Sequence, residues 1–216
     1  MSETECSFRP LNCELNYLTV SDGSTMFMQG DTTVIAGVFG PVEGKQQKMF
    51  YNKANVDATF GPVKGPPSIN DRLMELYIRD TCEGSILTAL HPASTISVNI
   101  QELQDSGGLL ACAINASCLA LINSSVPMKY TFAAVCCMID KESGSIIIDP
   151  SSTQLKKSKA TFTFAFDSLN KELICCQSSG KFKEEELIGA VEKCKEASQH
   201  LFDFYRDIVK RYATAI

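Results

Sequence analysis

The chain has 216 residues, of which 44% are hydrophobic and 21% are charged, and its net charge at neutral pH is −5. A chain of this length buries roughly 70% of the surface that its unfolded form exposes, so it is large enough for a substantial globular core. The net negative charge excludes a protein that binds nucleic acid through its overall charge. No apolar run approaches the roughly 18 residues that a membrane crossing needs.

The first part of the chain predicts an antiparallel meander of short strands. The pattern over 12–39 is strand, turn, strand, turn, strand. Leu15 and Leu18 lead to a first turn at 21–23, and the strands 25–29 and 33–39 follow, separated by Gly30 and Asp31. A polar loop over 40–48 and another strand over 49–60 are expected next. The prolines of 61–67 end this strand, because proline lacks the backbone donor that strand pairing uses.

A helix is predicted from about Ile69 to Leu90, with Ser68 as its N-cap and a bend or break at Gly84. Its expected buried side consists of Leu73, Leu76, Tyr77 and Cys82. Apolar and polar residues then alternate over 95–103, which predicts a strand with one buried face.

The stretch 104–122, QDSGGLLACAINASCLALI, joins a polar Gly-Gly turn to a helix of unusually small residues. Such a turn presents backbone N–H groups and the positive end of the helix dipole to an anion, most plausibly phosphate. Leu109 and Leu110 follow directly, and neither side chain can bind phosphate. Two interpretations stay open, an anion site and a tight turn that serves the fold, and we favour the second.

Two hairpins and a long helix are predicted for the second half of the chain. The hairpins pair 131–139 with 145–149 and 160–167 with 172–178, and a polar, basic segment over 151–159 connects them. Apolar residues recur at three and four positions over 183–213, which predicts one amphipathic helix. The expected fold class is α/β (α+β), with mixed sheets and helices in a single domain over 1–216.

The ten cysteines lie mostly within apolar segments, and no CxxC pair occurs among them. We interpret them as buried reduced thiols rather than as disulfides or a metal site. The two histidines make zinc binding and histidine-based catalysis improbable. The N-terminal residues include acidic side chains and no apolar segment of the kind that directs export, so an intracellular protein is expected.

Three segments together resemble the RNase PH family, and the resemblance covers nearly the whole chain. Residues 30–41, GDTTVIAGVFGP, are similar to the family's G-x-T-x-V strand that runs to Gly-Pro. Residues 105–121 are similar to its D-G-G-T-R-x-x-x-I-N-A-x-x-x-A-L motif, and residues 146–149 to its apolar strand that ends in aspartate. The resemblance implies an RNase PH-like fold.

Enzymes of this family use inorganic phosphate to shorten RNA from its 3′ end. The Thr-Arg pair after the double glycine holds the phosphate, and an acidic cluster supports the chemistry. By this resemblance the degenerate phosphate site consists of Ser106, Gly107, Gly108, Leu109 and Leu110. The degenerate acidic site consists of Asp149, with Leu155 and Thr161 in place of later aspartates. Leucine cannot imitate the bidentate fork of arginine, so we predict no phosphorolysis, no cofactor and no metal.

An RNase PH-like chain without this site resembles a non-catalytic subunit of the eukaryotic RNA exosome core ring. The resemblance implies other RNase PH-like subunits as partners in a hetero-hexameric ring, together with RNA-binding cap subunits. It also implies a part in rRNA maturation and mRNA decay, weak RNA binding by the chain alone, no membrane association, and a location in the nucleus, the nucleolus and the cytoplasm.

Two basic groups are candidates for contacts with RNA phosphates. Lys64 and Arg72 lie near the proline-rich loop, which faces the central pore in rings of the family, and Lys156, Lys157 and Lys159 form a basic run. The alternative for both groups is solvated surface charge. Two other functions stay open, a homodimeric nucleic-acid-binding protein and a metal-dependent nuclease that acts through Asp149 outside the exosome.

Overall fold

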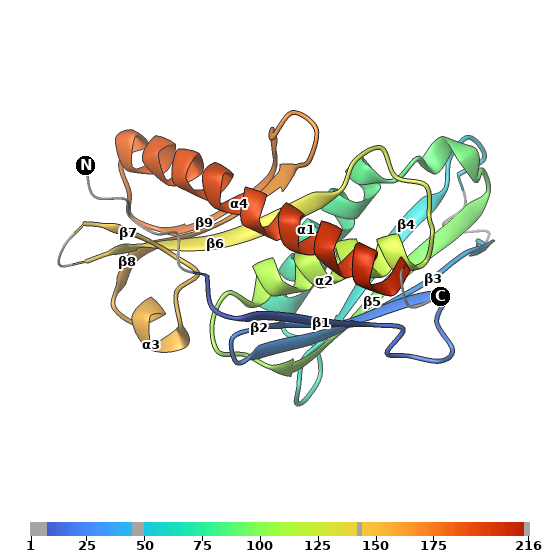
Figure 1. Ribbon diagram of the computed structural model, residues 1–216, viewed down its shortest axis with the longest axis horizontal. Helices are drawn as coiled ribbons and strands as arrows, with labels where there is room; N and C mark the ends of the chain where they lie inside the picture. Colours follow the sequence, from blue (N-terminus) through green and yellow to red (C-terminus); the bar gives the residue numbers. More distant parts are fainter. Residues whose placement is uncertain (1–7, 45–49, 142–143, 214–216) are drawn as a thin grey trace.

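The computed structural model describes residues 8–44, 50–141 and 144–213 (Figure 1). Its first sheet has five strands in the order β1-β2-β3-β5-β4, and all neighbours are antiparallel except β4 and β5. The strands are β1 (Leu11–Leu15), β2 (Gly23–Gln29), β3 (Thr32–Glu43), β4 (Asn55–Gly61) and β5 (Ser94–Gln104). The predicted meander and the alternating strand over 95–103 are therefore confirmed.

The second sheet is antiparallel, with the strand order β7-β6-β8-β9. Its strands are β6 (Phe132–Asp140), β7 (Ile146–Ile148), β8 (Ser158–Asp167) and β9 (Leu173–Gly180). The central strand β6 is buried from Phe132 to Ile139, because helices pack against it and its sequence is almost entirely apolar. Both predicted hairpins are confirmed.

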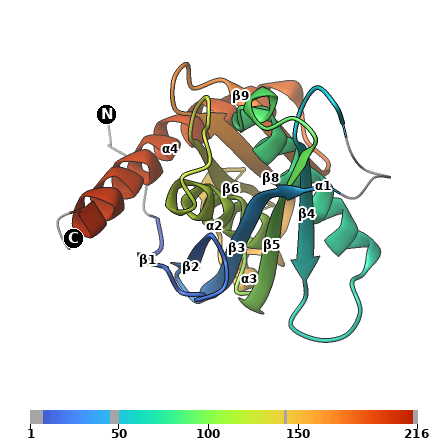
Figure 2. The same cartoon turned by 90° about the vertical axis from the view of Figure 1, so that its right-hand side faces the viewer.

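The small-residue helix α2 (Leu109–Asn123) packs between the two sheets, against β2 and β3 on one side and β6 on the other (Figure 2). Its residues 110–121 are all buried. Alanine, serine and cysteine let the backbone approach both sheets closely, which is how interiors reach their high packing density. The prediction of close packing from small residues is therefore confirmed.

One polar side chain of α2 crosses this packed interior. The Asn115 side-chain amide donates to the Ala134 carbonyl at 2.9 Å, and its oxygen accepts from the Ala134 N–H at 2.7 Å. The same oxygen accepts from the Tyr205 hydroxyl at 2.9 Å. Asn115 therefore links α2 to β6 and to the last helix, and its amide oxygen accepts two hydrogen bonds.

The last helix, α4 (Glu184–Ala213), extends over 30 residues and packs on β6 and β8. It begins with three glutamates and ends near Lys210 and Arg211, an arrangement that complements the helix dipole. The predicted amphipathic helix is confirmed. No helix in the described part of the chain is long and apolar enough to cross a membrane.

Helix α1 (Ile69–Ser85) begins after a capping box at Ser68, as predicted, and a 3-10 turn, η2 (Thr88–Leu90), follows it. The prediction of its buried side was wrong for Leu73 and Leu76, each of which is 42% exposed. The helix instead buries Ile78, Thr81, Cys82 and Ser85. Apolar spacing predicted a helix correctly, but it did not show which face of that helix packs on the core, where Met74 and Tyr77 are half-buried.

Three boundaries differ from the sequence predictions. Strand β3 continues through Gly40 and Pro41 to Glu43, with a bulge after Phe39 where a loop was expected. Strand β4 begins only at Asn55, and the first residue of the predicted strand, Met49, lies outside the described residues. A short helix, α3 (Ser152–Leu155), forms within the segment 151–159 that was expected to be a connection.

The cysteines follow the expected burial in most cases. Seven are buried, at positions 13, 82, 112, 118, 136, 137 and 194, whereas Cys175 is half-buried and Cys176 is exposed. Burial disfavours the thiolate, and it raises the pKa of Cys118 and of Cys136 to about 12. These side chains therefore act as small hydrophobic residues rather than as nucleophiles.

Candidate functional site

The turn between β5 and α2 has the left-handed backbone that two adjacent glycines allow. The φ angles of Gly107 and Gly108 are 111° and 69°. A Cβ atom on Gly107 would lie 2.6 Å from the Pro150 carbonyl oxygen. The turn is thus pressed against the segment that follows β7, and alanine does not fit at this position without a shift of the backbone.

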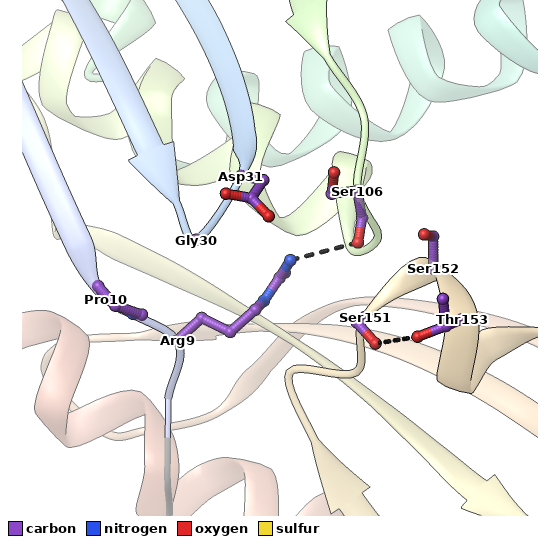
Figure 3. Close-up of a pocket in the computed structure, with 8 residues that line it drawn as sticks. All are labelled: Arg9, Pro10, Gly30, Asp31, Ser106, Ser151, Ser152 and Thr153. Carbon is purple, nitrogen blue, oxygen red and sulfur yellow. Dashed lines mark hydrogen bonds between the residues drawn. The ribbon is translucent and has the colours of Figure 1, made fainter.

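Arg9, two residues before β1, fills the space in front of this turn (Figure 3). Its Nη2 atom donates to Asp149 Oδ1 at 2.6 Å, while its Nε and backbone N–H both donate to Oδ2 at 3.0 Å. The guanidinium also donates to the carbonyl oxygens of Ser106 at 3.3 Å and Gly107 at 3.0 Å. One cation therefore serves both the Gly-Gly turn and the carboxylate after β7.

This ion pair is largely shielded from water. The Asp149 side chain is fully buried, and the Arg9 side chain is 18% exposed. Burial alone would lower the pKa of Arg9, but the hydrogen bond and the charge of Asp149 outweigh it and raise that pKa. Because both Asp149 oxygens accept hydrogen bonds from Arg9, this carboxylate is not open to a metal or a substrate.

Four backbone groups of the turn bind to the chain itself. The Thr32 hydroxyl donates to the Gly107 carbonyl at 2.8 Å and accepts from the Ser106 N–H at 3.1 Å. Asp105 Oδ1 accepts from the Gly107 N–H at 2.8 Å, and the Ser152 N–H donates to the Ser106 carbonyl at 2.8 Å. This arrangement favours the interpretation of the turn as part of the fold.

The two leucines that occupy the Thr-Arg positions belong to the hydrophobic core. Leu110 is 6% exposed, and Leu109 is half-buried against the core cluster. The N-cap of α2 is Gly108, and no side chain caps it. The start of this helix therefore offers an anion no charged or polar side chain from positions 108, 109 and 110.

A pocket of about 480 Å³ opens beside the ion pair, as Figure 3 shows. It is lined by Arg9, Pro10, Gly30, Asp31, Ser106, Ser151, Ser152 and Thr153. Its one lining cation, Arg9, is already neutralised by Asp149, and Asp31 adds a negative charge. A phosphate dianion would therefore meet hydroxyl groups but no uncommitted positive charge in this pocket.

The structure brings Asp149 next to the degenerate phosphate site, and it places the other two positions of the degenerate acidic site on different elements. Leu155 ends α3, and Thr161 lies on β8 opposite Met138. The Asp149 N–H donates to the Cys136 carbonyl, and Thr163 is the β8 residue opposite Cys136. Within the described ranges, no group of three or more His, Cys, Asp or Glu side chains could hold a metal ion.

The candidate RNA-binding residues form two separate groups. Lys64 lies on the exposed loop before α1, and Arg72 lies on α1, with Nη1 3.8 Å from Glu75 Oε2. Lys156 and Lys157 directly follow α3. The two groups therefore come from different elements of the fold, the loop and first turn of α1 on the one hand and the segment after α3 on the other.

Lys159 differs from its neighbours because it has a partner within the chain. Its Nζ atom donates to the two carboxylate oxygens of Glu186, at 2.6 and 2.9 Å. This hydrogen bond, together with the one from the Lys183 N–H, lowers the pKa of Glu186. Contact between Lys159 and RNA would therefore require the loss of an existing ion pair.

Sequence reasoning missed Arg9 and Thr32, the two side chains that hold the turn. Arg9 stands alone before the first strand, and no motif marks it. Thr32, by contrast, occupies the threonine of the G-x-T-x-V pattern, so the pattern contained a usable signal. Its role as donor and acceptor became visible only when β3 and the turn were seen side by side.

Comparisons with known proteins agree with this geometry. The models of the 3′ exoribonuclease family match residues 7–127 (domain 1) and 129–197 (domain 2). The chain is 29% identical over 221 residues to the rice (Oryza sativa) "Exosome complex exonuclease RRP46 homolog", with 95% of this chain and 92% of that protein covered. It is 36% identical over 157 residues to the Arabidopsis thaliana protein of the same description, with 73% of this chain and 65% of that protein covered.

The fold is similar to the crystal structure of rice Rrp46. The TM-score is 0.91 at 30% sequence identity, and the match covers 95% of this chain and 96% of the rice chain. The prediction of an RNase PH-like fold is therefore confirmed.

Proposed function

The chain belongs to the 3′ exoribonuclease family, and we propose that it is a non-catalytic structural subunit of the RNA exosome core ring. In this role it supports 3′-to-5′ RNA processing and degradation by forming interfaces with neighbouring subunits. The similarity to exosome RRP46 proteins over most of the chain supports this proposal.

The observation that carries the non-catalytic assignment is the Arg9–Asp149 ion pair in front of the Gly-Gly turn. An enzyme that uses phosphate needs an uncommitted cation where the phosphate binds. Here the nearest arginine is paired with a buried carboxylate, and leucines follow the glycines. The names of the rice and Arabidopsis relatives include "exonuclease", whereas the site of this chain supports a structural role.

The nuclease alternative depends on Asp149 as a metal ligand. Both oxygens of that carboxylate accept hydrogen bonds from Arg9, so metal binding would have to break the pair and leave Arg9 with only its carbonyl and Thr32 acceptors. This geometry favours the ring-subunit proposal over the nuclease.

The finer parts of the proposal concern partners, RNA and location. We place other RNase PH-like subunits beside this chain in a hetero-hexameric ring and RNA-binding cap subunits above the ring. Lys64 and Arg72 are the residues that we assign to RNA threading, because Lys64 lies on an exposed loop and the Arg72 side chain is 70% exposed, with only a long contact of 3.8 Å to Glu75. The proposed location is the nucleus, including the nucleolus, and the cytoplasm.

Co-expression with the RNase PH-like subunits of the same organism tests the proposal. We expect the chain to enter a stoichiometric ring, measured by gel filtration with light scattering. The purified chain alone should leave a labelled RNA intact with phosphate, with Mg²⁺ or with Mn²⁺. The proposal fails if the chain stays outside the ring, if phosphate promotes RNA shortening, or if metal promotes cleavage that Asp149→Asn abolishes.

A further inference from the structure

Strand β9 is an edge of the second sheet, and it has a neighbouring strand on one side only. It pairs with β8 over residues 173–180. In the part of the chain that the structure describes, backbone hydrogen bonds join β9 to β8 and to no other segment. In an antiparallel strand, every second residue directs its N–H and C=O groups away from the neighbour. The outer edge of β9 therefore presents a row of backbone donors and acceptors without a backbone partner.

This edge lacks the features with which proteins usually block strand edges. Charged residues, proline and short length are the common means. The sequence of β9, LICCQSSG, has 8 residues, with no charged residue and no proline. The other edge strands differ, since β1 contains Glu14, β4 contains Asp57 and β7 has 3 residues. Among the described strands, β9 is therefore the one edge that is both long and uncharged.

The side chains of β9 leave much of the strand open to solvent. Helix α1 packs on one face of β9, where Cys175 is half-buried and its thiol contacts the Thr81 side chain. Successive side chains of a strand point to opposite faces, and the next residue, Cys176, is exposed. Residues 178–180 are exposed as well. Contact with α1 thus covers one face of β9 in part, and the end of the strand stays accessible.

The free backbone groups determine the kind of occupant. Donors and acceptors that alternate at the spacing of a strand match the backbone of another extended strand, and such main-chain hydrogen bonds supply the affinity when a strand is added to a sheet. RNA phosphates accept hydrogen bonds but donate none, so they would leave the outer C=O groups of β9 unpaired. The strand also has no cation that could bind a phosphate.

A second copy of the chain is a poor match for the whole edge. Two copies related by a two-fold axis would pair their β9 strands antiparallel, with the same residues on both sides. Pairing over the full strand places the apolar half, residues 173–176, opposite the half that consists of Gln177, two serines and Gly180. Cross-strand pairs stabilise a sheet through contacts between matching side chains, so this symmetric pairing gains little from its side chains.

We propose that the outer edge of β9 accepts an uncharged extended strand from a neighbouring subunit of the ring, which continues the second sheet. The side chains of the added strand are apolar opposite residues 173–176 and small or polar opposite residues 177–180. This inference rests on the proposed function, since it takes the occupant from the ring neighbours. Backbone hydrogen bonds hold the strand, and no charge on β9 is needed.

Hydrogen exchange at single amides tests the added strand directly. In the isolated chain, the β9 amides that donate to β8 should exchange slowly and the alternate amides fast. In the co-expressed ring, we expect the alternate amides of 173–180 to exchange about tenfold more slowly or less. Deuterium exchange with fragmentation to single residues, in reducing buffer, measures both states. Burial of the whole face would slow exchange without this alternation.

Lysines on the edge provide a second measurement. Cys176→Lys with Ser178→Lys places charges at two exposed positions of β9, which is how natural edges avoid pairing. We expect recovery of the complex to fall about tenfold. The matched control, Cys176→Thr with Ser178→Thr, keeps both positions uncharged and suits a strand, so it should assemble like the wild type. Thermal melting shows whether each variant is folded, and exchange of the wild type decides the question if the lysine variant is not.

The outcomes separate this inference from the proposed function. If the ring forms while the alternate amides still exchange fast, or if a folded lysine variant assembles as well as the control, the assignment of the outer edge is wrong and the ring-subunit proposal stands. If the wild type enters no ring, the proposed function fails, and this inference fails with it. Alternate protection in the isolated chain that grows with protein concentration would show that a second copy occupies the edge, and it would overturn the inference.

Discussion

At the residue scale, Arg9 is the side chain on which the proposed lack of catalysis depends. Arg9 comes from the segment before β1, whereas the family pattern expects an arginine as the second residue after the double glycine, where Leu110 stands. An arginine at position 110 would serve to bind phosphate, whereas Arg9 serves the fold. Arg9 is bound to a carboxylate of the chain and to two carbonyl oxygens of the turn, so its charge holds the fold together.

The Arg9–Asp149 pair should make a large and mutually dependent contribution to stability. Removing one partner leaves the other charge poorly compensated in a shielded site, so we expect Arg9→Ala to lower the free energy of unfolding by about 3–5 kcal/mol. Asp149→Asn should also destabilise the chain. The double variant should lose less than the sum of the two, by about 1.5–3 kcal/mol, in urea unfolding at neutral pH.

The surface pair Arg206–Asp203 provides the control for this cycle. Its side chains are 69% and 66% exposed, so its coupling energy should stay below about 1 kcal/mol. Additive effects of Arg9→Ala and Asp149→Asn would contradict the assignment of a shielded ion pair.

Glu102 should make stability depend on pH. Burial, with further contributions from the nearby carboxylates of Asp105 and Asp71, raises its pKa. The folded state then holds the proton more tightly than the unfolded state, so this stabilisation is present at low pH and lost as pH rises through the folded pKa. At neutral pH the charged form is destabilising.

Glu102→Gln removes that charge and should raise the free energy of unfolding slightly at pH 7, by a small amount because solvent screens the charge of a partly exposed side chain. The gain should disappear at about pH 3, where Glu102 is protonated in both states. Urea unfolding at both pH values measures the difference. The exposed Glu192→Gln provides the comparison, and an equal gain for Glu102→Gln at both pH values would exclude the proposed cause.

At the element scale, periodic patterns predicted the strands, α2 and α4, but they did not predict the contacts between elements. Apolar and polar residues alternate over 95–103 because one face of that strand is buried. The pattern therefore shows directly which residues face the core. The face of α1 that packs on the core contains Met74 and Tyr77, whereas Leu73 and Leu76 lie beside it and were misassigned. The capping box of Ser151 and Gln154 was a readable sign of α3 that the basic run obscured.

Asn115 shows how one residue of an element can connect three elements. Asn115→Ala leaves the Ala134 N–H and carbonyl and the Tyr205 hydroxyl without this partner in the packed interior. We expect a loss of about 3 kcal/mol in the free energy of unfolding, since each unsatisfied buried group costs roughly 1–3 kcal/mol and the effects are not additive. Tyr205→Phe removes one of these bonds and should cost about 1 kcal/mol.

Ser117→Ala is the matched control on the same helix. The Ser117 hydroxyl is also buried, but it donates only to the Ala113 carbonyl of the preceding turn. Its loss should change the free energy of unfolding by less than about 1 kcal/mol. Equal effects of Asn115→Ala and Ser117→Ala would show that the connection between elements contributes little.

At the scale of the whole molecule, the candidate site is assembled from segments far apart in the chain. Arg9, Thr32, Ser106, Asp149 and Ser152 meet because α2 brings the first sheet against the second. The family pattern identified the turn and Asp149, since both belong to continuous motifs. It did not identify Arg9, because the contact depends on the path of the segment before β1 over the completed fold.

Because the site is assembled in this way, we predict that restoring the family's residues at positions 109 and 110 will not produce phosphorolytic activity. Leu109→Thr with Leu110→Arg places an arginine at a buried core position, next to a site whose carboxylate is already paired with Arg9. We expect a loss of about 3 kcal/mol in the free energy of unfolding, no phosphate-dependent shortening of a labelled RNA, and no rise of Tm in phosphate. Leu169→Arg, at a 69% exposed leucine, is the control, and its free energy of unfolding should stay within about 0.5 kcal/mol of the wild-type value.

Phosphate-dependent stabilisation of the double variant together with RNA shortening would mean that Leu109 and Leu110 alone had abolished activity at the site. The expected result would instead attribute the lack of phosphorolytic activity to the whole arrangement, that is, to the Arg9–Asp149 pair together with the missing later aspartates.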